Sequence, residues 1–380
     1  MKKIALLGFG VVGKGAYDII AKRSDMEVVR VLVRRPIEEI AAISTTDIND
    51  IISDPAIDTV VEVMGGVHPA CEYISAALSA GKNVVTANKA VISACYKELT
   101  ALAAEKGVAL RCTAAVGGGI PWLINLERCG RIDTVTEVSG IMNGTTNYIM
   151  DAMHRSPVAF ADILKKAQEL GYAEADPSAD IDGDDIRRKL TISANIAFDA
   201  LLNEEDIPMF GIRTVTDGDI AAFQREGYVC KLIATARRTE SGVAAWLQPT
   251  LVDSHALEAA VPANYNLISF QSEYLGRQSY YGQGAGRYPT ASNVVQDCVD
   301  IACGKNAFYA DKAQPMQPDN SGVTFSYYVR TGVTDRWLNS ITEKAMGDGV
   351  VTAPVSVSEM LSWAKSKLTE DSTLFIAAIG

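Results

Sequence analysis

Asp185 and Lys189 are the pair of residues whose types and spacing most clearly suggest chemistry. They stand four residues apart at the start of an apolar segment with the spacing of a helix, so both side chains project from one helical face. A carboxylate one turn from an amine favours the ammonium form, which can donate a proton to an oxygen that becomes negative during a reaction. Lys189 is therefore a candidate acid, and an ordinary surface ion pair is the alternative.

Other polar residues can complete a site around this pair. Glu174, Asp176 and Asp180 lie upstream on an irregular, proline-containing stretch, where carboxylates can fold back over the helix and face a cationic ligand. Asn143 and Thr145 lie between a strand and a helix, where they can cap the helix and donate to a carboxylate. The pattern predicts a site for a small zwitterion, and a solvated charged loop is the alternative.

A second candidate site begins at the glycine pattern Gly8-Phe-Gly-Val-Val-Gly13, which follows a strand expected over residues 3–7 and opens a helix. In such a turn the first glycine permits the tight bend, the second lets backbone N–H groups approach a pyrophosphate, and the third lets the helix pack on the strand. The pattern predicts a dinucleotide cofactor, and a glycine turn without a ligand is the alternative. The residues expected to contact the cofactor are Gly8, Phe9, Gly10, Val11, Val12, Gly13, Arg34, Arg35, Met64, Lys89 and Gly284.

Arg34 and Arg35 follow the second expected strand, residues 27–33. A fold that prefers NAD usually has an acidic residue here for the ribose 2′-hydroxyl, whereas a guanidinium suits a 2′-phosphate. We therefore expect NADP(H) to be preferred, with NAD(H) also usable, and two solvent-facing arginines are the alternative.

The elements that would position these residues alternate between strand and helix over the first third of the chain. This alternation predicts a parallel α/β sheet whose ligand crevice lies at the carboxyl ends of the strands. Lys89 should lie there at the start of a helix, and an ordinary surface lysine is the alternative. A cation at a helix start opposes the helix dipole, so its presence there favours a role in binding. The glycine-rich turn at residues 114–121 can bind an ion or allow close packing.

Beyond residue 131 strands dominate, which predicts an α+β domain with a mostly antiparallel sheet. The expected organisation is a Rossmann-type nucleotide-binding domain (1–130, completed by about 284–303), a substrate and dimerisation domain (131–283), a linker (304–323) and a small C-terminal module (324–380). Residues 280–292 are expected to open a helix that runs to about residue 303. An antiparallel sheet of this kind often pairs across a two-fold axis, which suggests a homodimer, with a tetramer as the alternative.

The composition of the chain excludes several classes of partner. The net charge of -11 disfavours nucleic acid and anionic membranes as partners, and no apolar run approaches the length of a membrane span. The seven cysteines are scattered without a C-x-x-C pair, which indicates reduced thiols in a cytoplasmic protein without zinc. A small-molecule substrate is expected.

In their joint order, several segments resemble the homoserine dehydrogenase family over about residues 1–303. They are Gly8–Gly13, Thr86–Lys89, Val116–Pro121, Gly140–Asn147, Gly171–Pro177, Asp185–Lys189 and Gly284–Gly286. The resemblance implies reversible, NAD(P)H-dependent reduction of L-aspartate 4-semialdehyde to L-homoserine, in the biosynthesis of threonine, methionine and isoleucine.

The resemblance also implies roles for single residues. Lys189 matches the acid/base lysine, Lys89 a lysine near the nicotinamide, and Asp185 an acid that binds the substrate. The positions that match the substrate site are Glu174, Asp180, Tyr172, Gly144 and Thr145. The positions that match backbone-carbonyl ligands of a sodium or potassium ion are Thr113, Val116, Gly118 and Ile120.

Two features depart from the family pattern. Thr113 stands where the family usually has a glutamate. The tail from residue 324, expected to run roughly β-α-β-α-β, resembles an ACT regulatory module only loosely, because the usual glycine-containing turn reads Asp335-Arg-Trp-Leu338 and the module is short, which leaves regulation by threonine open. Two other functions compete: an NADP-dependent dehydrogenase of another amino-acid aldehyde or hydroxy acid, and a nucleotide or amino-acid sensor without turnover. Substrate profiling separates the first, and tight NADPH binding without turnover would indicate the second.

Overall fold

The computed structural model describes residues 1–240, 242–305 and 313–380, which form two compact units. The first unit comprises residues 1–133, 195–201 and 282–315, and the second comprises residues 134–194, 202–281 and 316–380. The expected domain boundaries stay a prediction, and residues 306–312 of the expected linker lie outside the described residues. Within the described ranges, no helix has the length and apolar character that a membrane crossing requires.

The first unit is built on a six-stranded parallel sheet with strand order β3-β2-β1-β4-β5-β6. Its strands are β1 (Lys2–Leu7), β2 (Met26–Leu32), β3 (Ser44–Thr45), β4 (Thr59–Glu62), β5 (Asn83–Thr86) and β6 (Leu110–Arg111). Its helices include α1 (Val11–Ile20), α2 (Asn49–Ile52), α3 (Ala70–Ser79), α4 (Lys89–Lys106), α5 (Trp122–Gly130) and α11 (Arg287–Ala302). The short strands β8 (Ala200–Leu201) and β13 (Gln314–Pro315) pair separately.

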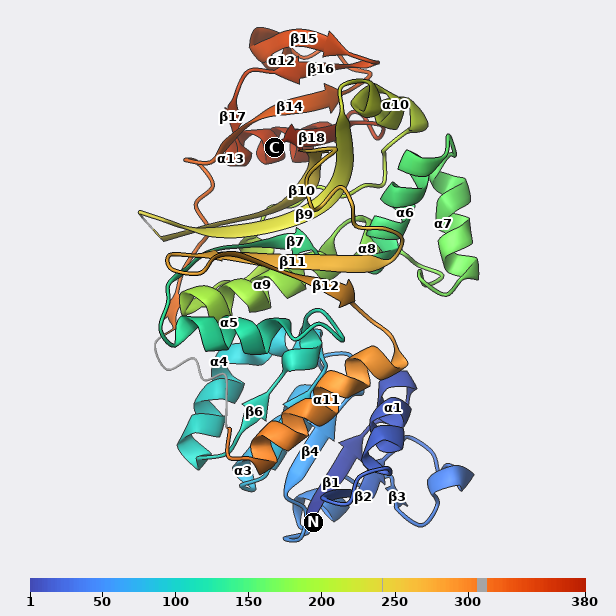
Figure 1. Cartoon of the computed structure of the whole chain (residues 1–380), viewed down its shortest axis with the longest axis vertical. Coiled ribbons are helices and arrows are strands. Elements are labelled where there is room, and N and C mark those ends of the chain that lie inside the picture. The colour runs from blue at the N-terminus through green and yellow to red at the C-terminus, as the bar shows by residue number, and fades with distance from the viewer. Residues whose placement is uncertain (241, 306–312) are drawn as a thin grey trace. The chain divides into compact units, whose positions relative to one another are not determined.

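Alternation of side chains along β1 explains the two layers of helices. Ile4 and Leu6 belong to the core shared with α1 and α11, whereas Ala5 and Leu7 belong to the core shared with α3 and α4, as the two-residue period of a strand requires. Helix α11 lies beside α1 although the two are distant in sequence (Figure 1). This confirms the expected parallel α/β fold and places the carboxyl ends of β1, β2 and β4 at one edge.

The second unit is built on a mostly antiparallel sheet, as expected. In the described part of the chain the order is β12-β11-β7-β9-β10-β18-β14-β16-β15, with β17 paired to β14. The strands are β7 (Val135–Ile141), β9 (Tyr228–Thr239), β10 (Gly242–Asp253), β11 (Tyr265–Ser272), β12 (Gly276–Gln283), β14 (Thr324–Arg330), β15 (Thr342–Met346), β16 (Gly349–Thr352), β17 (Val355–Ser356) and β18 (Phe375–Ile379). The α-helices are α6 (Gly144–Arg155), α7 (Phe160–Glu169), α8 (Ser178–Ile181), α9 (Asp184–Phe198), α10 (Asp217–Arg225), α12 (Arg336–Ile341) and α13 (Val357–Lys367). The last turn of α9, from residue 195 on, belongs to the first unit.

Some element boundaries differ from the expected ones. Residues 280–283 form the end of strand β12, so the helix that they were expected to open begins only at Arg287. Every second residue of β12 is exposed and its sequence is polar, so it lacks the apolar alternation that marks a strand. Helix α9 ends at Phe198, because Asp199 adopts a left-handed conformation with φ of 51°.

The C-terminal segment extends the sheet of the second unit. Strand β18 pairs in parallel with β10 and antiparallel with β14, and Figure 1 shows the sheet continuing from β10 into these strands. The segment runs β14, α12, β15, β16, β17, α13 and β18, so the expected β-α-β-α-β order has additional strands between its two helices, and β15 and β16 form a hairpin. Its ACT-like character stays a prediction.

Candidate active site

A pocket of about 790 Å³ opens at the carboxyl ends of β1, β2 and β4 in the first unit. Its lining residues include Gly8, Phe9, Gly10, Val33, Arg34, Arg35, Pro36, Ile37, Thr46, Met64 and Tyr73. Phe9, Arg34, Arg35 and Met64 thus lie where the sequence places a cofactor. Ile37, Thr46 and Tyr73 were not predicted: Ile37 and Thr46 come from irregular segments and Tyr73 from helix α3, and none of the three belongs to a motif.

The glycines of the first turn are required by close approaches and backbone conformation. A Cβ on Gly13 would meet the carbonyl oxygen of Gly8 at 2.4 Å, and Gly8 has φ of +102°. A Cβ on Gly10 would meet nothing within 4 Å, so the start of α1 is open beside the pocket. Gly10 is the N-cap of α1 and gives no side-chain cap, so the first N–H groups of α1 suit a pyrophosphate. A dinucleotide therefore fits the residues present.

Lys89 is the first residue of α4, and its neighbours hold the start of that helix. The Asn88 side chain caps α4 by accepting from Val91 N–H, and its amide donates to the carbonyl oxygen of Gly66 at 2.7 Å. The buried Glu62 carboxylate accepts from the Thr86 hydroxyl at 2.6 Å and from Asn88 at 3.3 Å. Glu62 was not predicted, because an acidic residue that ends a buried strand has no sequence pattern of its own.

In the second unit, Lys189 lies in a buried polar cluster. Its Nζ donates to Asp185 Oδ2 at 2.6 Å and to the carbonyl oxygen of Met142 at 2.7 Å. Lys189 is 8% exposed and Asp185 is 6% exposed, so the pair is desolvated and the alternative of an ordinary surface ion pair does not apply. These two contacts leave one of the three ammonium N–H bonds for a substrate oxygen.

Asn143 joins the two acidic residues of this cluster. Its amide donates to Asp180 Oδ1 at 2.7 Å and to Asp185 Oδ2 at 2.8 Å, while its oxygen caps α6 by accepting from Thr146 N–H. Burial raises the pKa of the Asp180 carboxyl, and the hydrogen bond from Asn143 opposes this. The sequence indicated Asn143 as a cap, but only the structure shows that it bridges the carboxylates.

The other predicted substrate residues lie on the segments next to this cluster. The Thr145 hydroxyl donates to the carbonyl oxygen of Tyr172 at 2.5 Å, which connects α6 to the loop before α8. Gly144 begins α6, and a Cβ there would meet the carbonyl oxygen of Asn264 at 2.7 Å. Glu174 is exposed on the same loop as Tyr172, so its carboxylate is accessible to a ligand.

The predicted ion ligands lie on the turn after β6. Thr113 begins a short 3-10 helix, and both its N–H and its hydroxyl donate to the buried Asp297 carboxylate, at 2.9 and 2.7 Å. Gly118 has φ of +53°, and a Cβ there would meet the carbonyl oxygen of Gly284 at 2.5 Å. Gly284 therefore packs against this turn, and it is not among the lining residues of the nucleotide pocket.

The glycine turn, the parallel sheet and its pocket define a protein of the dinucleotide-binding oxidoreductase class. Comparison with known families agrees: the NAD-binding domain of homoserine dehydrogenase matches residues 8–113, and the homoserine dehydrogenase domain matches residues 121–299. The homoserine dehydrogenase of Bacillus subtilis is 39% identical over 88% of this chain and 82% of its own length. That of Lactococcus lactis is 41% identical over 78% of this chain and 73% of its own length.

Solved structures give the same result. A homoserine dehydrogenase from Thiobacillus denitrificans superposes with a TM-score of 0.87 and 31% identity, over 100% of this chain and 98% of that one. The chain belongs to the homoserine dehydrogenase family and is an NAD(P)-dependent oxidoreductase. The sequence-based predictions of family, enzyme class and nicotinamide cofactor are thereby confirmed.

Proposed function

We propose that this chain reduces L-aspartate 4-semialdehyde to L-homoserine, and the reverse, with Lys189 as the proton donor and NADPH as the preferred cofactor. The observation that carries the proposal is the buried ammonium of Lys189, which Asp185 and the Met142 carbonyl hold in place. The cofactor, when bound, supplies the hydride. The resulting alkoxide then needs a proton, and a desolvated, oriented ammonium is suited to provide it.

The surrounding residues suit a zwitterionic substrate. Asp180 and the exposed Glu174 offer carboxylates for the α-ammonium group. The start of α6 at Gly144 and Thr145 suits the α-carboxylate, because helix N-termini attract anions. Lys89 begins α4 in the first unit, and we assign it to the nicotinamide and substrate side of the cofactor.

The assay that tests the proposal follows NADPH absorbance after addition of L-aspartate 4-semialdehyde, and NADP reduction after addition of L-homoserine. Lys189→Ala should lower kcat by about 100-fold or more and leave the Kd of NADPH unchanged, as loss of general acid catalysis predicts. Lys166→Met, an exposed lysine of α7, is the control. If the wild type binds NADPH but shows no turnover with either substrate, the result would favour another aldehyde substrate or a sensor. Near-normal kcat in Lys189→Ala would contradict the role of Lys189.

The proposed NADPH preference rests on Arg34 and Arg35, which line the pocket. Replacing both with glutamine should lower kcat/KM for NADPH by about 10-fold or more, because charge-assisted hydrogen bonds contribute roughly 1.5 to 3 kcal/mol. The value for NADH should change less. Equal losses of kcat/KM with the two cofactors would show that the arginines do not bind the 2′-phosphate.

We also propose a homodimer formed through the sheet of the second unit. A hollow of about 700 Å³ spans β7, β9, β10 and β11, with Trp246 and Arg237 among its lining residues. Sedimentation equilibrium should give twice the mass of the chain, and a monomer at micromolar concentration would overturn this assignment.

The family resemblance further implies a sodium or potassium ion on the carbonyl oxygens of Thr113, Val116, Gly118 and Ile120. Two of these oxygens, those of Gly118 and Ile120, accept hydrogen bonds from the Asn293 amide. A cation at these two oxygens would therefore face an N–H donor, so the residues present do not fit the ion in this arrangement.

A further inference from the structure

One face of α11 contacts the turn of residues 113–120 at three successive positions. Pro289, Asn293 and Asp297 are spaced four residues apart, so they lie along one helical face. A Cβ on Gly119 would meet Pro289 Cβ at 2.8 Å, and Asp297 accepts two hydrogen bonds from Thr113. The turn is therefore held tightly on the helix at both of its ends.

Asn293 contacts the middle of the same turn. It is 7% exposed, and its Nδ2 donates to the carbonyl oxygen of Gly118 at 2.6 Å and to that of Ile120 at 3.0 Å. The Ile120 oxygen also accepts from Trp122 N–H at 2.8 Å. Both lone pairs of that oxygen are thus engaged, which leaves it little capacity for a metal ion.

We propose that the Asn293 amide takes the place of a monovalent cation in this chain and makes its stability independent of sodium and potassium. An amide N–H pair presents partial positive charge to carbonyl oxygens, as a bound cation does, and two positive groups cannot share the position. Thr113 supports this assignment, because a neutral residue there removes the carboxylate that would favour a cation. The proposal rests on the contacts of the turn and does not require Lys189 to be the proton donor.

The opposite orientation of the amide leads to the opposite expectation. If the Asn293 amide were rotated by half a turn, its Oδ1 would face the oxygens of Gly118 and Ile120, and only a cation between them would relieve the repulsion. Orientation and cation dependence are therefore coupled. A measurement of cation dependence decides between the two arrangements.

The experiment measures Tm of the full chain without cofactor in sodium, potassium or tetramethylammonium chloride at equal ionic strength. The wild type should have the same Tm in all three salts within about 1 °C. Asn293→Asp replaces the donor by a carboxylate, and Asn293→Ala leaves the carbonyl oxygens without the amide. In each variant sodium or potassium should raise Tm above its tetramethylammonium value by at least about 2 °C, because a ligand that binds only the folded state stabilises it.

Ser292→Asp is the matched control, since it adds the same charge at the neighbouring exposed position of α11. It should show no difference between the salts. A wild type that sodium or potassium stabilises over tetramethylammonium would overturn the proposal. Variants at Asn293 that are as insensitive to cations as the wild type would overturn it as well. If Asn293→Asp does not fold, Asn293→Ala provides the same comparison.

Discussion

At the scale of single residues, the polar cluster around Lys189 combines an ammonium, two carboxylates and one amide. Asn143 donates to both Asp180 and Asp185, so it lessens the repulsion between the carboxylates. Burial nevertheless raises the pKa of Asp180. A carboxyl group whose pKa is raised by folding destabilises the folded state when it is charged, so the penalty is present at high pH and disappears below the unfolded pKa of about 4.

The raised pKa of Asp180 leads to a prediction for Asp180→Asn. The variant should be more stable than the wild type at pH 7, and the difference should shrink as the pH falls towards about 4, because the wild-type carboxyl takes up a proton as the pH falls. Its KM for L-homoserine should rise, because a carboxylate near the α-ammonium is lost. Urea unfolding across this pH range measures the effect. Asp176→Asn is the control. Hydrogen bonds from Ser178 lower the pKa of this exposed carboxyl, so replacing the carboxylate should not stabilise the folded protein. A constant difference between pH 4 and pH 7 would contradict the account for Asp180.

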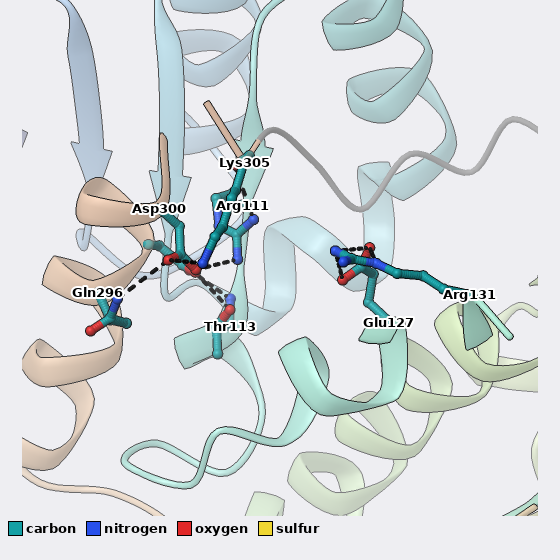
Figure 2. A network of polar contacts seen from close by, with 8 residues as sticks. Arg111, Thr113, Glu127, Arg131, Gln296, Asp300 and Lys305 are labelled. Atoms are coloured by element: carbon teal, nitrogen blue, oxygen red, sulfur yellow. Dashed lines mark hydrogen bonds and ion pairs between the residues drawn. The ribbon is translucent and has the colours of Figure 1, made fainter. Parts of the chain in front are cut away.

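At the scale of elements, a buried ion network joins the end of β6 to α11. Arg111 Nε donates to Asp297 at 2.9 Å and its Nη2 donates to Asp300 at 3.0 Å. Figure 2 shows Arg111, Thr113 and Asp300 converging, while the pair of Glu127 in α5 and Arg131 just after it lies apart from them. Burial raises the pKa of Asp297, and the Arg111 charge opposes the rise. The Arg111 guanidinium, together with the two hydrogen bonds from Thr113, thus reduces the cost of burying the Asp297 carboxylate.

Arg111→Met should lower the free energy of unfolding by about 3 to 5 kcal/mol at pH 7, because it leaves buried carboxylates without their cation. The loss in free energy of unfolding should be smaller at pH 5. Without Arg111 the pKa of Asp297 rises further, and burial of a protonated carboxyl costs less free energy than burial of a carboxylate. Arg131→Met, which removes the exposed ion pair with Glu127, should lower the free energy of unfolding by less than about 1 kcal/mol at either pH. Urea unfolding measures both variants, and equal losses for the two would refute the assigned role of the buried network.

At the scale of the whole molecule, the C-terminal segment completes the core of the second unit. Tyr327, Tyr328 and Phe375 are fully buried. The Tyr328 ring packs on Phe223 of α10 with centroids 4.8 Å apart, and its hydroxyl donates to Asp219 at 2.6 Å. The paired strands β10 and β18 make the segment a continuation of the sheet.

Deletion of residues 324–380 should therefore abolish cooperative unfolding of the second unit. Each large buried aromatic contributes roughly 1.5 to 3 kcal/mol, and three of them approach the total stability of an ordinary domain. Far-UV circular dichroism during urea titration measures the loss. Tyr328→Phe is the control, because it keeps the ring and should cost about 1.5 to 3 kcal/mol, as expected for a hydrogen bond to a charged acceptor. A truncated chain that unfolds cooperatively at the wild-type urea midpoint would show that the segment is a separable module.

The sequence by itself determined the alternating strands and helices of the first unit, the glycine turn and the family. These depend on local rules: side-chain periodicity, the backbone freedom of glycine and a motif that is contiguous in the chain. The same rules located Asp185 and Lys189 on one face of α9, because four residues of a helix bring two side chains together wherever that helix lies.

Only the tertiary structure decided what surrounds those residues. The burial of the Lys189 ammonium, the bridge from Asn143 to two carboxylates and the amide of Asn293 on the turn after β6 all join segments far apart in the chain. The continuation of the sheet into β18 was missed for the same reason. Long-range pairing is set by the packing of the whole unit. A local sequence pattern does not specify which distant residues will contact a given segment.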